Sequence, residues 1–555
     1  MKVACYVHPI VHRLGPDCAY SHFKIFADLL HNLRRDAAAD CLLISGSHFF
    51  SLAAEEGRSL YGLRTLALDE VSLYRKIRGL GVLPTSLDAL ASASANGNYE
   101  ALQPLANEIL SASKDFIPDV VISLGIQISF LEAVWPNALL LHAEAGPYSR
   151  NPYPWSMFFD HPGIYGRSVI SQAGARLRKH AASADMAALA EAFRIRNVNA
   201  LKSSNPFPID HLRSQFARLC LLPLQVSNYC SFEHQASYRT QFEFLIDVLT
   251  MAPKHVGIVV TEYNEWGPVL KTDGPGANLR YLRQTFPNLI FHGDFRRWFS
   301  PSQFLVPCVD GVWSVSSNVG LQALLFNRLL GSPLTSQLAA VADATSLAEF
   351  FGELDRGDSL KNNNNFVAWQ LERYLVSQCF LSDGRWLCDY FARRIDAAKN
   401  ASDPLDGFVR IADVDRIERA WIRNAPAPVA RRVDRPIEDR YDEARSQVEV
   451  LENQLKTLDA CHAQLKTLQA SYAQSNAQHA LLLQSTSWRV MAPLRMATTV
   501  FRKCRARIFM LMTSTASKAA CTLVPRTGVR GVWLRTLRRR FVQKRQPRRR
   551  SLPSS

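Results

Sequence analysis

Hydrophobic positions in the first 400 residues alternate between short apolar runs and stretches with helical spacing. Apolar runs typical of buried strands cover residues 2–7, 40–45, 118–125 and 137–142. Between the first two runs, residues 21–33 place Phe23 and Phe26 on one face of a predicted helix. Strands that alternate with helices predict an α/β fold, in which a parallel sheet is covered by helices on both faces.

A second series of the same kind follows. Its strands are predicted at 218–226, 256–261, 289–292 and 311–315, and its helices at 238–251, 278–285 and 319–326. Two successive α/β units favour two Rossmann-like domains, residues 1–205 and 206–400, with a ligand in the cleft between them. A single large α/β domain is the alternative.

The pattern changes beyond residue 400. Residues 401–436 end in a stretch rich in Ala, Pro and Arg, which is typical of a linker. Residues 437–485 are polar and nearly free of Gly and Pro, and Val448 and Leu451 begin a run of apolar residues with 4-3 spacing. This spacing predicts a coiled coil of about three to four heptads, weakened by His462 in its seam, through which the chain would form homo-oligomers. A single long exposed helix is the alternative.

Charge is distributed unevenly along the chain. Residues 486–555 hold 18 of the 65 basic residues and no acidic residue, which leaves 47 basic and 49 acidic residues before them. This near-neutral body excludes a nucleic-acid-binding surface along the whole chain. In the tail, arginines alternate with Trp, Phe, Leu and Met, which suits a helix lying on an anionic membrane surface. Nucleic-acid binding and an unstructured tail are the alternatives.

Three further features bear on location. The chain enters a strand-like run at once, without the pattern of a secretory signal, and it has no run of about 18 apolar residues. Its 11 cysteines are scattered and include no C-x-x-C pair, which is typical of buried thiols in a reducing compartment. We therefore expect a cytoplasmic protein, peripheral on the inner face of the plasma membrane.

The segment with the most specific chemistry is Ser316-Ser317-Asn318-Val-Gly320, between a predicted strand and a predicted helix. Backbone N–H groups, two hydroxyls and the positive end of the helix dipole would face one point there, an arrangement that binds a phosphate without a metal. The alternative is that Ser317 only caps its helix.

Polar residues also follow the strand predicted at 256–261. This strand would deliver five of them to its carboxyl end, where open α/β sheets bind ligands. They are Thr261, Glu262, Tyr263, Asn264 and Glu265. Trp266 follows and could pack on a base or a sugar. A satisfied loop with no ligand is the alternative.

A third cluster follows the strand predicted at 137–142. Glu144 at this strand end is a candidate general base with a raised pKa, and Asp160 is held in reserve. Aromatic and basic side chains nearby suit contacts with sugar rings, and the candidates are Tyr148, Arg150, Tyr153 and Trp155. A purely structural aromatic cluster is the alternative. His161-Pro162 is interpreted as a loop feature.

Together these segments resemble the bacterial capsule polysaccharide biosynthesis family. The Ser316-Ser317 segment is similar to the family's Ser-Ser motif at the nucleotide phosphate, and 221–226 resembles the segment that opens the second domain. Members include GT-B glycosyltransferases that use CMP-activated Kdo. The sequence departs from the family at Ala145, where a second acid is common, and at Tyr263-Asn264, where His-Pro is expected.

The resemblance implies a GT-B enzyme with an acceptor domain first and a nucleotide-sugar domain second. It would invert the anomeric carbon without a metal, and it would build capsule or O-antigen on a glycan or lipid-linked acceptor. It would need no cofactor beyond a nucleotide sugar, for which CMP-Kdo is favoured. The only Asp-x-Asp found, Asp413-Val-Asp415, lies beyond the α/β body. A GT-B enzyme with another nucleotide sugar and a non-catalytic assembly scaffold are the rival hypotheses.

Overall fold

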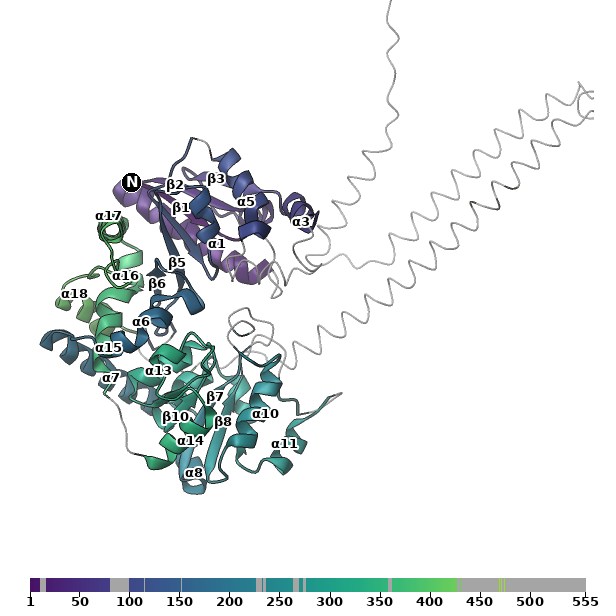
Figure 1. Cartoon of the computed structure of the whole chain (residues 1–555), viewed down its shortest axis with the longest axis vertical. Helices are drawn as coiled ribbons and strands as arrows, with labels where there is room; N and C mark the ends of the chain where they lie inside the picture. The colour runs from purple at the N-terminus through teal and green to yellow at the C-terminus, as the bar shows by residue number, and fades with distance from the viewer. Residues whose placement is uncertain are drawn as a thin grey trace, which may run out of the picture. The chain divides into compact units, whose positions relative to one another are not determined.

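The computed structural model describes most of the chain up to residue 430. The described residues are 1–9, 16–79, 99–113, 115–150, 152–225, 232, 236–262, 269–272, 276–357, 362–426, 430, 469, 471 and 474. Contacts divide the chain into two units, Met1–Arg445 and Ser446–Ser555, and every element below belongs to the first (Figure 1). The predicted coiled coil (437–485) lies outside the described residues except for three isolated positions, and the basic tail (486–555) lies outside them entirely.

The first unit contains two sheets. The seven-stranded sheet has the order β12-β6-β5-β4-β1-β2-β3. Its strands are β1 (Lys2–Tyr6), β2 (Asp40–Gly46), β3 (Arg64–Leu68), β4 (Val120–Leu124), β5 (Leu139–Ala145), β6 (Ser156–Asp160) and β12 (Leu375–Ser377). The first five are parallel. At one edge β6 pairs antiparallel with β5 and β12 pairs antiparallel with β6, so β12 runs in the same direction as the first five.

The five-stranded sheet has the order β11-β10-β7-β8-β9 and is parallel throughout. Its strands are β7 (Arg218–Pro223), β8 (Val256–Thr261), β9 (Leu289–Ile290), β10 (Gly311–Trp313) and β11 (Leu329–Gly331). In chain order, the parallel strands of each sheet follow the pattern 3-2-1-4-5 of a doubly wound fold. The predicted α/β class is therefore confirmed.

Helices connect the strands and cover the sheets. In the first half they are α1 (Pro16–Ala37), α2 (Ser47–Glu55), α3 (Glu70–Gly79), α5 (Tyr99–Ala112), η1 (Ser129–Ala133), η2 (Tyr165–Arg167), α6 (Val169–Arg178), α7 (Ala184–Ser203) and α8 (Ile209–Gln215). In the second half they are α10 (Gln241–Met251), α11 (Leu279–Thr285), η3 (Gly293–Arg297), α12 (Pro301–Leu305), η4 (Val306–Cys308), α13 (Asn318–Leu325), η5 (Ala339–Val341), α14 (Leu347–Arg356), α15 (Asn364–Trp369), η6 (Gln370–Tyr374), α16 (Gln378–Leu381), α17 (Gly384–Lys399), α18 (Val414–Glu418) and η7 (Arg419–Arg423).

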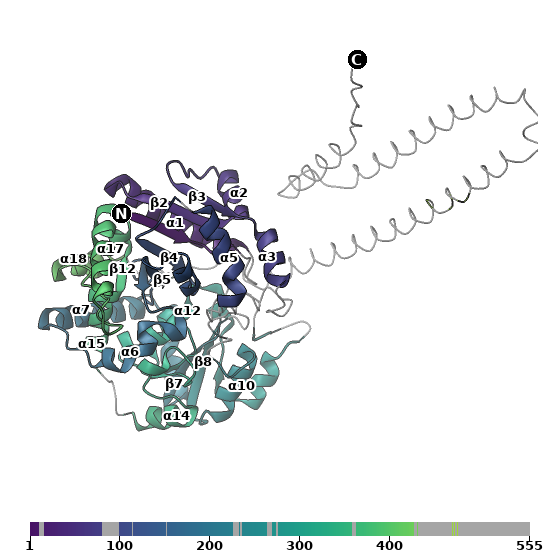
Figure 2. The same cartoon turned by 45° about the horizontal axis from the view of Figure 1, so that its top comes forward.

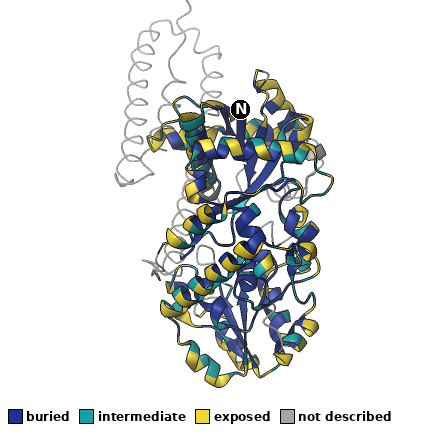
Figure 3. Ribbon diagram, turned by 90° about the vertical axis from the view of Figure 1, so that its left-hand side faces the viewer, coloured by how far each residue is buried: buried dark blue, intermediate teal, exposed yellow. Residues whose placement is uncertain are grey.

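The first sheet is buried on both faces, which explains why its strands read as continuous apolar runs. Successive side chains of a strand point to opposite faces. In β1, Val3 and Cys5 belong to one hydrophobic core, whereas Ala4 and Tyr6 belong to another. Figure 3 shows the strands of both sheets buried, with helices that turn an exposed side to solvent.

After the second sheet, the chain returns to the first. Strand β12 pairs with β6, and α17 packs on α1, where the Gly384 N–H donates to Asp36 Oδ2 at 3.0 Å. Figures 1 and 2 both show α17 beside α1. The domain bounds 1–205 and 206–400 remain a prediction. They do not account for the return of the chain to the first sheet at β12 and α17.

The segment expected to be a linker is partly folded. Within 401–436, α18 and η7 are helical, and Ile417 and Trp421 are fully buried. Each of these helices has five residues and follows the last strand, so they leave little periodic signal in the sequence. Among the residues that the structure describes, no helix combines the length and apolarity needed to cross a membrane.

Candidate functional site

The strand order gives each sheet one place to bind a ligand. In a doubly wound sheet, ligands bind beyond the carboxyl ends of the strands, where the strand order reverses. In the first sheet that place lies between β1 and β4, and Gly125 directly follows β4. In the second sheet it lies between β7 and β10, and Ser316 there donates a 2.9 Å hydrogen bond to Gln225 Oε1. Gln225 is not among the predicted site residues.

The Ser-Ser segment opens α13 as predicted. The Ser317 side chain caps the helix by accepting a hydrogen bond from the Val319 N–H at 3.3 Å. Ser316 is 7% exposed, and Ser317 and Asn318 are partly exposed. The helix N-terminus, with its hydroxyls and positive dipole, is therefore accessible at Ser317 and Asn318.

Gly320 has a packing role in the structure. A Cβ on Gly320 would stand 2.7 Å from Leu338 Cδ1 and 3.2 Å from Leu330 Cδ1. The glycine therefore lets α13 approach the core closely. Its position facing these leucines does not fit the predicted contact with a nucleotide sugar.

Two side chains of α13 join the two sheets at this point. Asn318 Nδ2 donates to the Ala145 carbonyl oxygen at 3.2 Å, and Gln322 Nε2 donates to the Pro147 carbonyl oxygen at 2.8 Å. Gln322 is 2% exposed, so its contact is made inside the protein. The helix N-terminus of the second sheet is thereby held against the loop that follows Glu144.

Glu144 lies at the end of β5 and is partly exposed. Its Oε1 accepts a hydrogen bond from the Ala145 N–H at 3.0 Å. Burial raises the pKa of this carboxyl to about 7, against the opposing effects of that hydrogen bond and of the Arg150 charge. A carboxyl with such a pKa can accept and release a proton near neutral pH, as a general base must.

Asp160, the reserve candidate for the base, is fully buried at the end of β6. It accepts hydrogen bonds from the Val169 N–H at 2.9 Å, the Gly163 N–H at 3.3 Å and the Tyr374 hydroxyl at 3.2 Å. Burial raises its pKa to about 7. Because Asp160 is inaccessible and anchors the start of α6, its geometry fits a structural role and not that of a base acting on an acceptor.

The neighbouring His161 is also held within the structure. Arg394 Nη2 lies 3.3 Å from its Nδ1, and its ring packs 5.0 Å from that of Phe408. Burial lowers the pKa of His161 to about 3, so the ring is neutral at physiological pH. These contacts agree with its interpretation as a loop feature.

Two of the four predicted acceptor contacts are in the core. Tyr148 and Tyr153 are 0% and 1% exposed, and their rings pack against Phe193 at 5.5 and 6.0 Å. Buried rings offer no face to a sugar, so the predicted contact with a sugar ring does not fit these two tyrosines. They fit the alternative, a purely structural aromatic cluster. Arg150 is exposed and donates to Ser300 Oγ at 3.1 Å, while Trp155 is partly exposed.

The residues at the end of β8 are engaged in structural contacts where they are described. Thr261 Oγ1 lies 2.8 Å from Ser302 Oγ. Glu262 forms a buried ion pair with Arg296 at 2.7 Å and accepts from the Leu270 N–H at 2.7 Å. Burial raises the pKa of Glu262. Its predicted contact with a nucleotide sugar does not fit this pairing. Three further predicted residues, Tyr263, Asn264 and Glu265, lie outside the described residues.

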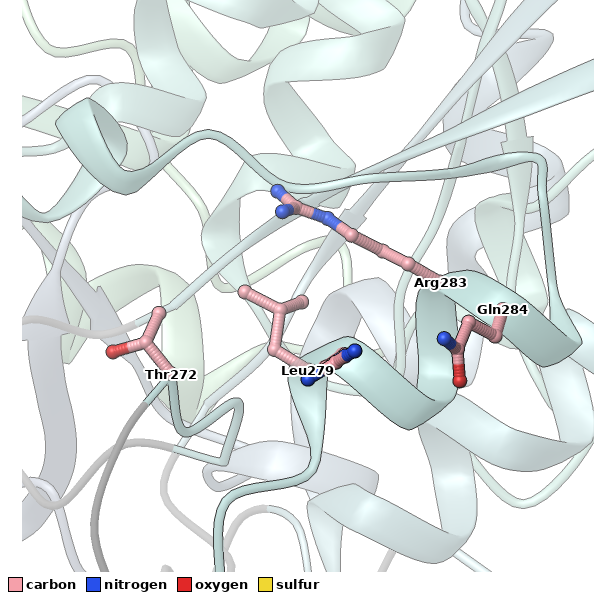
Figure 4. Close-up of a pocket in the computed structure, with 5 residues that line it drawn as sticks. Thr272, Leu279, Arg283 and Gln284 are labelled. Atoms are coloured by element: carbon pink, nitrogen blue, oxygen red, sulfur yellow. The ribbon is translucent and has the colours of Figure 1, made fainter.

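One open hollow of about 390 Å³ lies elsewhere, on α11 and the segment before it (Figure 4). It is lined by Thr272, Leu279, Arg280, Arg283 and Gln284. No predicted site residue lines it, so we place the candidate site where Glu144 and α13 meet. Within the described part of the chain, no three His, Cys, Asp or Glu side chains are grouped as metal ligands would be.

Known proteins provide little information about the role of this site. A scan against protein-family models finds no match, and neither does a search of curated proteins. Among solved structures, the beta-Kdo 2,7-transferase KpsC of Thermosulfurimonas dismutans is 16% identical, with a TM-score of 0.32 over 52% of this chain and 90% of its own. No family is shown.

Two other solved structures match at the same level. A UDP-GlcNAc 2-epimerase from Neisseria meningitidis is 11% identical over 70% of this chain and 99% of its own, with a TM-score of 0.30. The calicheamicin glycosyltransferase CalG4 is 10% identical over 72% and 97%, with a TM-score of 0.31. TM-scores this low carry no argument about activity, so the function must be inferred from the side chains themselves.

Proposed function

We propose that the chain is a glycosyltransferase of the GT-B type that transfers a sugar from a nucleotide donor to a glycan acceptor. The observation that carries the proposal is the meeting of α13 with the Glu144 loop through Asn318 and Gln322. A helix N-terminus suited to a phosphate and a carboxyl with a pKa of about 7 then belong to one site.

In the proposed reaction, Glu144 accepts the proton of an acceptor hydroxyl as that oxygen attacks the anomeric carbon of the donor. The bond between the anomeric carbon and the phosphate oxygen breaks, and its electron pair leaves with the nucleotide. Attack from the face opposite the phosphate inverts the anomeric configuration. Backbone N–H groups at the start of α13, with Ser316 and Ser317, stabilise the charge that develops on the leaving phosphate. These groups supply the stabilisation that a metal supplies elsewhere, so the proposed mechanism is metal-independent.

The Ser316-Ser317 segment favours CMP-Kdo as the donor, because of its resemblance to the capsule polysaccharide biosynthesis family. Capsule or O-antigen synthesis, on a lipid-linked or polysaccharide acceptor, is the corresponding process. The basic tail would hold the enzyme on the anionic inner face of the plasma membrane beside that acceptor, which raises its effective concentration. The coiled coil would form homo-oligomers.

The nucleotide titration described below also tests two rival hypotheses. Another nucleotide sugar is favoured if Tyr263 and Asn264 do not accept cytidine. A non-catalytic assembly scaffold is favoured if no nucleotide binds while oligomers still form.

Calorimetric titration of the full chain with CMP, UDP and GDP tests the proposal. We expect selective binding of CMP, lost in the double variant Ser316→Ala/Ser317→Ala. The control is Ser346→Ala, because Ser346 caps α14 through the same kind of hydrogen bond to Glu349 N–H, at 3.3 Å. Retained binding in the control would show that losing a helix cap elsewhere in the fold does not by itself abolish binding.

Selective binding of UDP or GDP would indicate a donor other than CMP-Kdo and would remain consistent with the proposed reaction. No binding of any nucleotide would reject the proposed site and leave the scaffold. The titration is carried out at raised salt so that the basic tail does not bind the nucleotide phosphates. Contacts of exposed arginines with phosphates weaken as ions screen them.

A further inference from the structure

A glycine opens a space beside Glu144. Gly125 follows β4 with a φ of 76°, a backbone conformation that other residues rarely adopt. Two hydrogen bonds fix it, one from its own N–H to the Ala143 carbonyl oxygen at 3.0 Å and one from the Tyr165 hydroxyl to its carbonyl oxygen at 2.9 Å. The glycine stands at the place between β1 and β4 where a doubly wound sheet binds its ligand.

Two titratable side chains face this bare glycine from different elements. A Cβ at Gly125 would lie 3.5 Å from Glu144 Oε2 and also 3.5 Å from His22 Cε1. His22 belongs to the second turn of α1 and is partly exposed. The imidazole of His22 and the carboxyl of Glu144 therefore lie beside the same glycine.

The two oxygens of Glu144 therefore have different surroundings. Oε1 accepts the Ala145 N–H at 3.0 Å, whereas Oε2 is the oxygen turned toward Gly125. Other charged or titratable groups that act on this carboxyl are Arg150, which favours its ionised form, and Tyr374, whose own pKa it helps to raise.

We propose that His22 and Glu144 share a proton across Gly125 and that His22 is a further catalytic residue of this site. The inference rests on the proposed function, because the role of His22 is to carry the proton of the acceptor hydroxyl from Glu144 to solvent. Glu144 accepts that proton as the new glycosidic bond forms, and passes it to a nitrogen of His22. His22 releases it to solvent, and Glu144 is again a carboxylate for the next turnover.

Kinetics of the full chain with the donor found by titration test this role. His22→Gln keeps a polar side chain of similar size but cannot carry the proton, so we expect kcat to fall about 100-fold, a typical value for one acid–base group. The KM for the donor should change less than about twofold, because His22 does not bind the donor. Added imidazole should restore turnover to His22→Gly, where the missing ring leaves room for it.

The matched control is His31→Gln on the same helix, where the His31 ring lies 2.9 Å from the Ser59 carbonyl oxygen. It should keep wild-type kinetics. Wild-type kcat in His22→Gln, or an equal loss in both variants, would overturn the catalytic role.

A second measurement needs no activity. Carbon NMR of side-chain-labelled glutamate follows the titration of Glu144, assigned by the signal lost in Glu144→Gln. Removing an imidazole that shares its proton with the carboxyl should shift the titration of Glu144 in His22→Gln. An unchanged titration rejects the pair. If the titration moves but the wild-type chain binds no nucleotide, the pair stands and the proposed function fails, so the two failures are distinguishable.

Discussion

At the scale of single residues, the ionisation of Glu144 gives the clearest prediction. A general base acts only when it is ionised, so turnover should fall about tenfold for each pH unit below the carboxyl's pKa of about 7. Glu144→Gln should lose about 100-fold or more in kcat at every pH and should no longer show this acid limb. The pH profile of kcat for both proteins, measured on the same donor, checks the prediction.

Thermal unfolding shows whether Glu144→Gln remains folded. Folding raises the pKa of this carboxyl from 4.5 to about 7, so ionised Glu144 lowers stability as pH rises through that range. At pH 8 the glutamine removes this cost, and the variant should melt at the same temperature as the wild type or higher. A lower melting temperature at pH 8 would mean that lost activity reflects damage to the fold.

Ser317 gives a second prediction at this scale. Its hydroxyl caps α13, so Ser317→Ala should lower the free energy of unfolding by about 1 kcal/mol and also weaken nucleotide binding. Ser346→Ala should cost a similar amount of stability, because it removes the cap of α14, and should leave binding intact. Denaturant unfolding and calorimetry of the two variants separate the effects. Equal binding in both would show that Ser317 is only a cap.

At the scale of elements, the contact between α13 and the loop after β5 should hold Glu144 in position beside the donor site. Gln322→Leu removes the hydrogen bond to the Pro147 carbonyl oxygen, and its shape fills nearly the same space. The buried Gln322 Oε1 has no partner, so part of the cost of losing the amide is offset. We expect donor affinity to be kept and kcat to fall about tenfold, because the base is no longer held in place. Parallel losses of affinity and kcat would contradict a role limited to positioning Glu144.

The sequence predicts elements well and side-chain roles less well. The runs at 256–261 and 319–326 give β8 (Val256–Thr261) and α13 (Asn318–Leu325), because apolar periodicity reflects which faces are buried. Gly320 and Tyr148 could not be assigned in this way. From the sequence alone, neither a glycine that packs against leucines nor a tyrosine in the core can be distinguished from a residue that contacts a ligand. Only their surroundings in the fold distinguish them. The same reason hid His22, which lies beside Gly125 and Glu144 only because the strand order 3-2-1-4-5 places β1 next to β4.

At the scale of the whole molecule, the return of the chain to the first sheet could not be predicted from local patterns. Strand β12 has three residues, and its partner β6 lies more than 200 residues earlier in the chain. Short elements whose partners are so distant leave little periodic signal. Their stability comes from packing with those partners, which the sequence does not place beside them.

The return of the chain makes residues 401–423 part of the fold, and this can be tested by truncation. Trp421 is fully buried and its ring lies edge-on to Phe193 at 5.6 Å and to Tyr148 at 6.5 Å. A chain that ends at residue 426 keeps these contacts and should unfold cooperatively at nearly the same temperature as the full chain. A chain that ends at residue 400 exposes the aromatic cluster and should melt much lower or fail to fold.

Within the full chain, Trp421→Ala should cost about 3–5 kcal/mol, the range for removing a large buried aromatic side chain. The partly exposed Ile422 provides the control, because Ile422→Ala should cost less. Calorimetric melting of the two truncated chains and the two point variants, each compared with the full chain, checks both predictions. If ending the chain at residue 400 left the melting temperature unchanged, the segment would be a linker, as its composition suggested. The contacts of Trp421 with Phe193 and Tyr148 would then contribute little to stability.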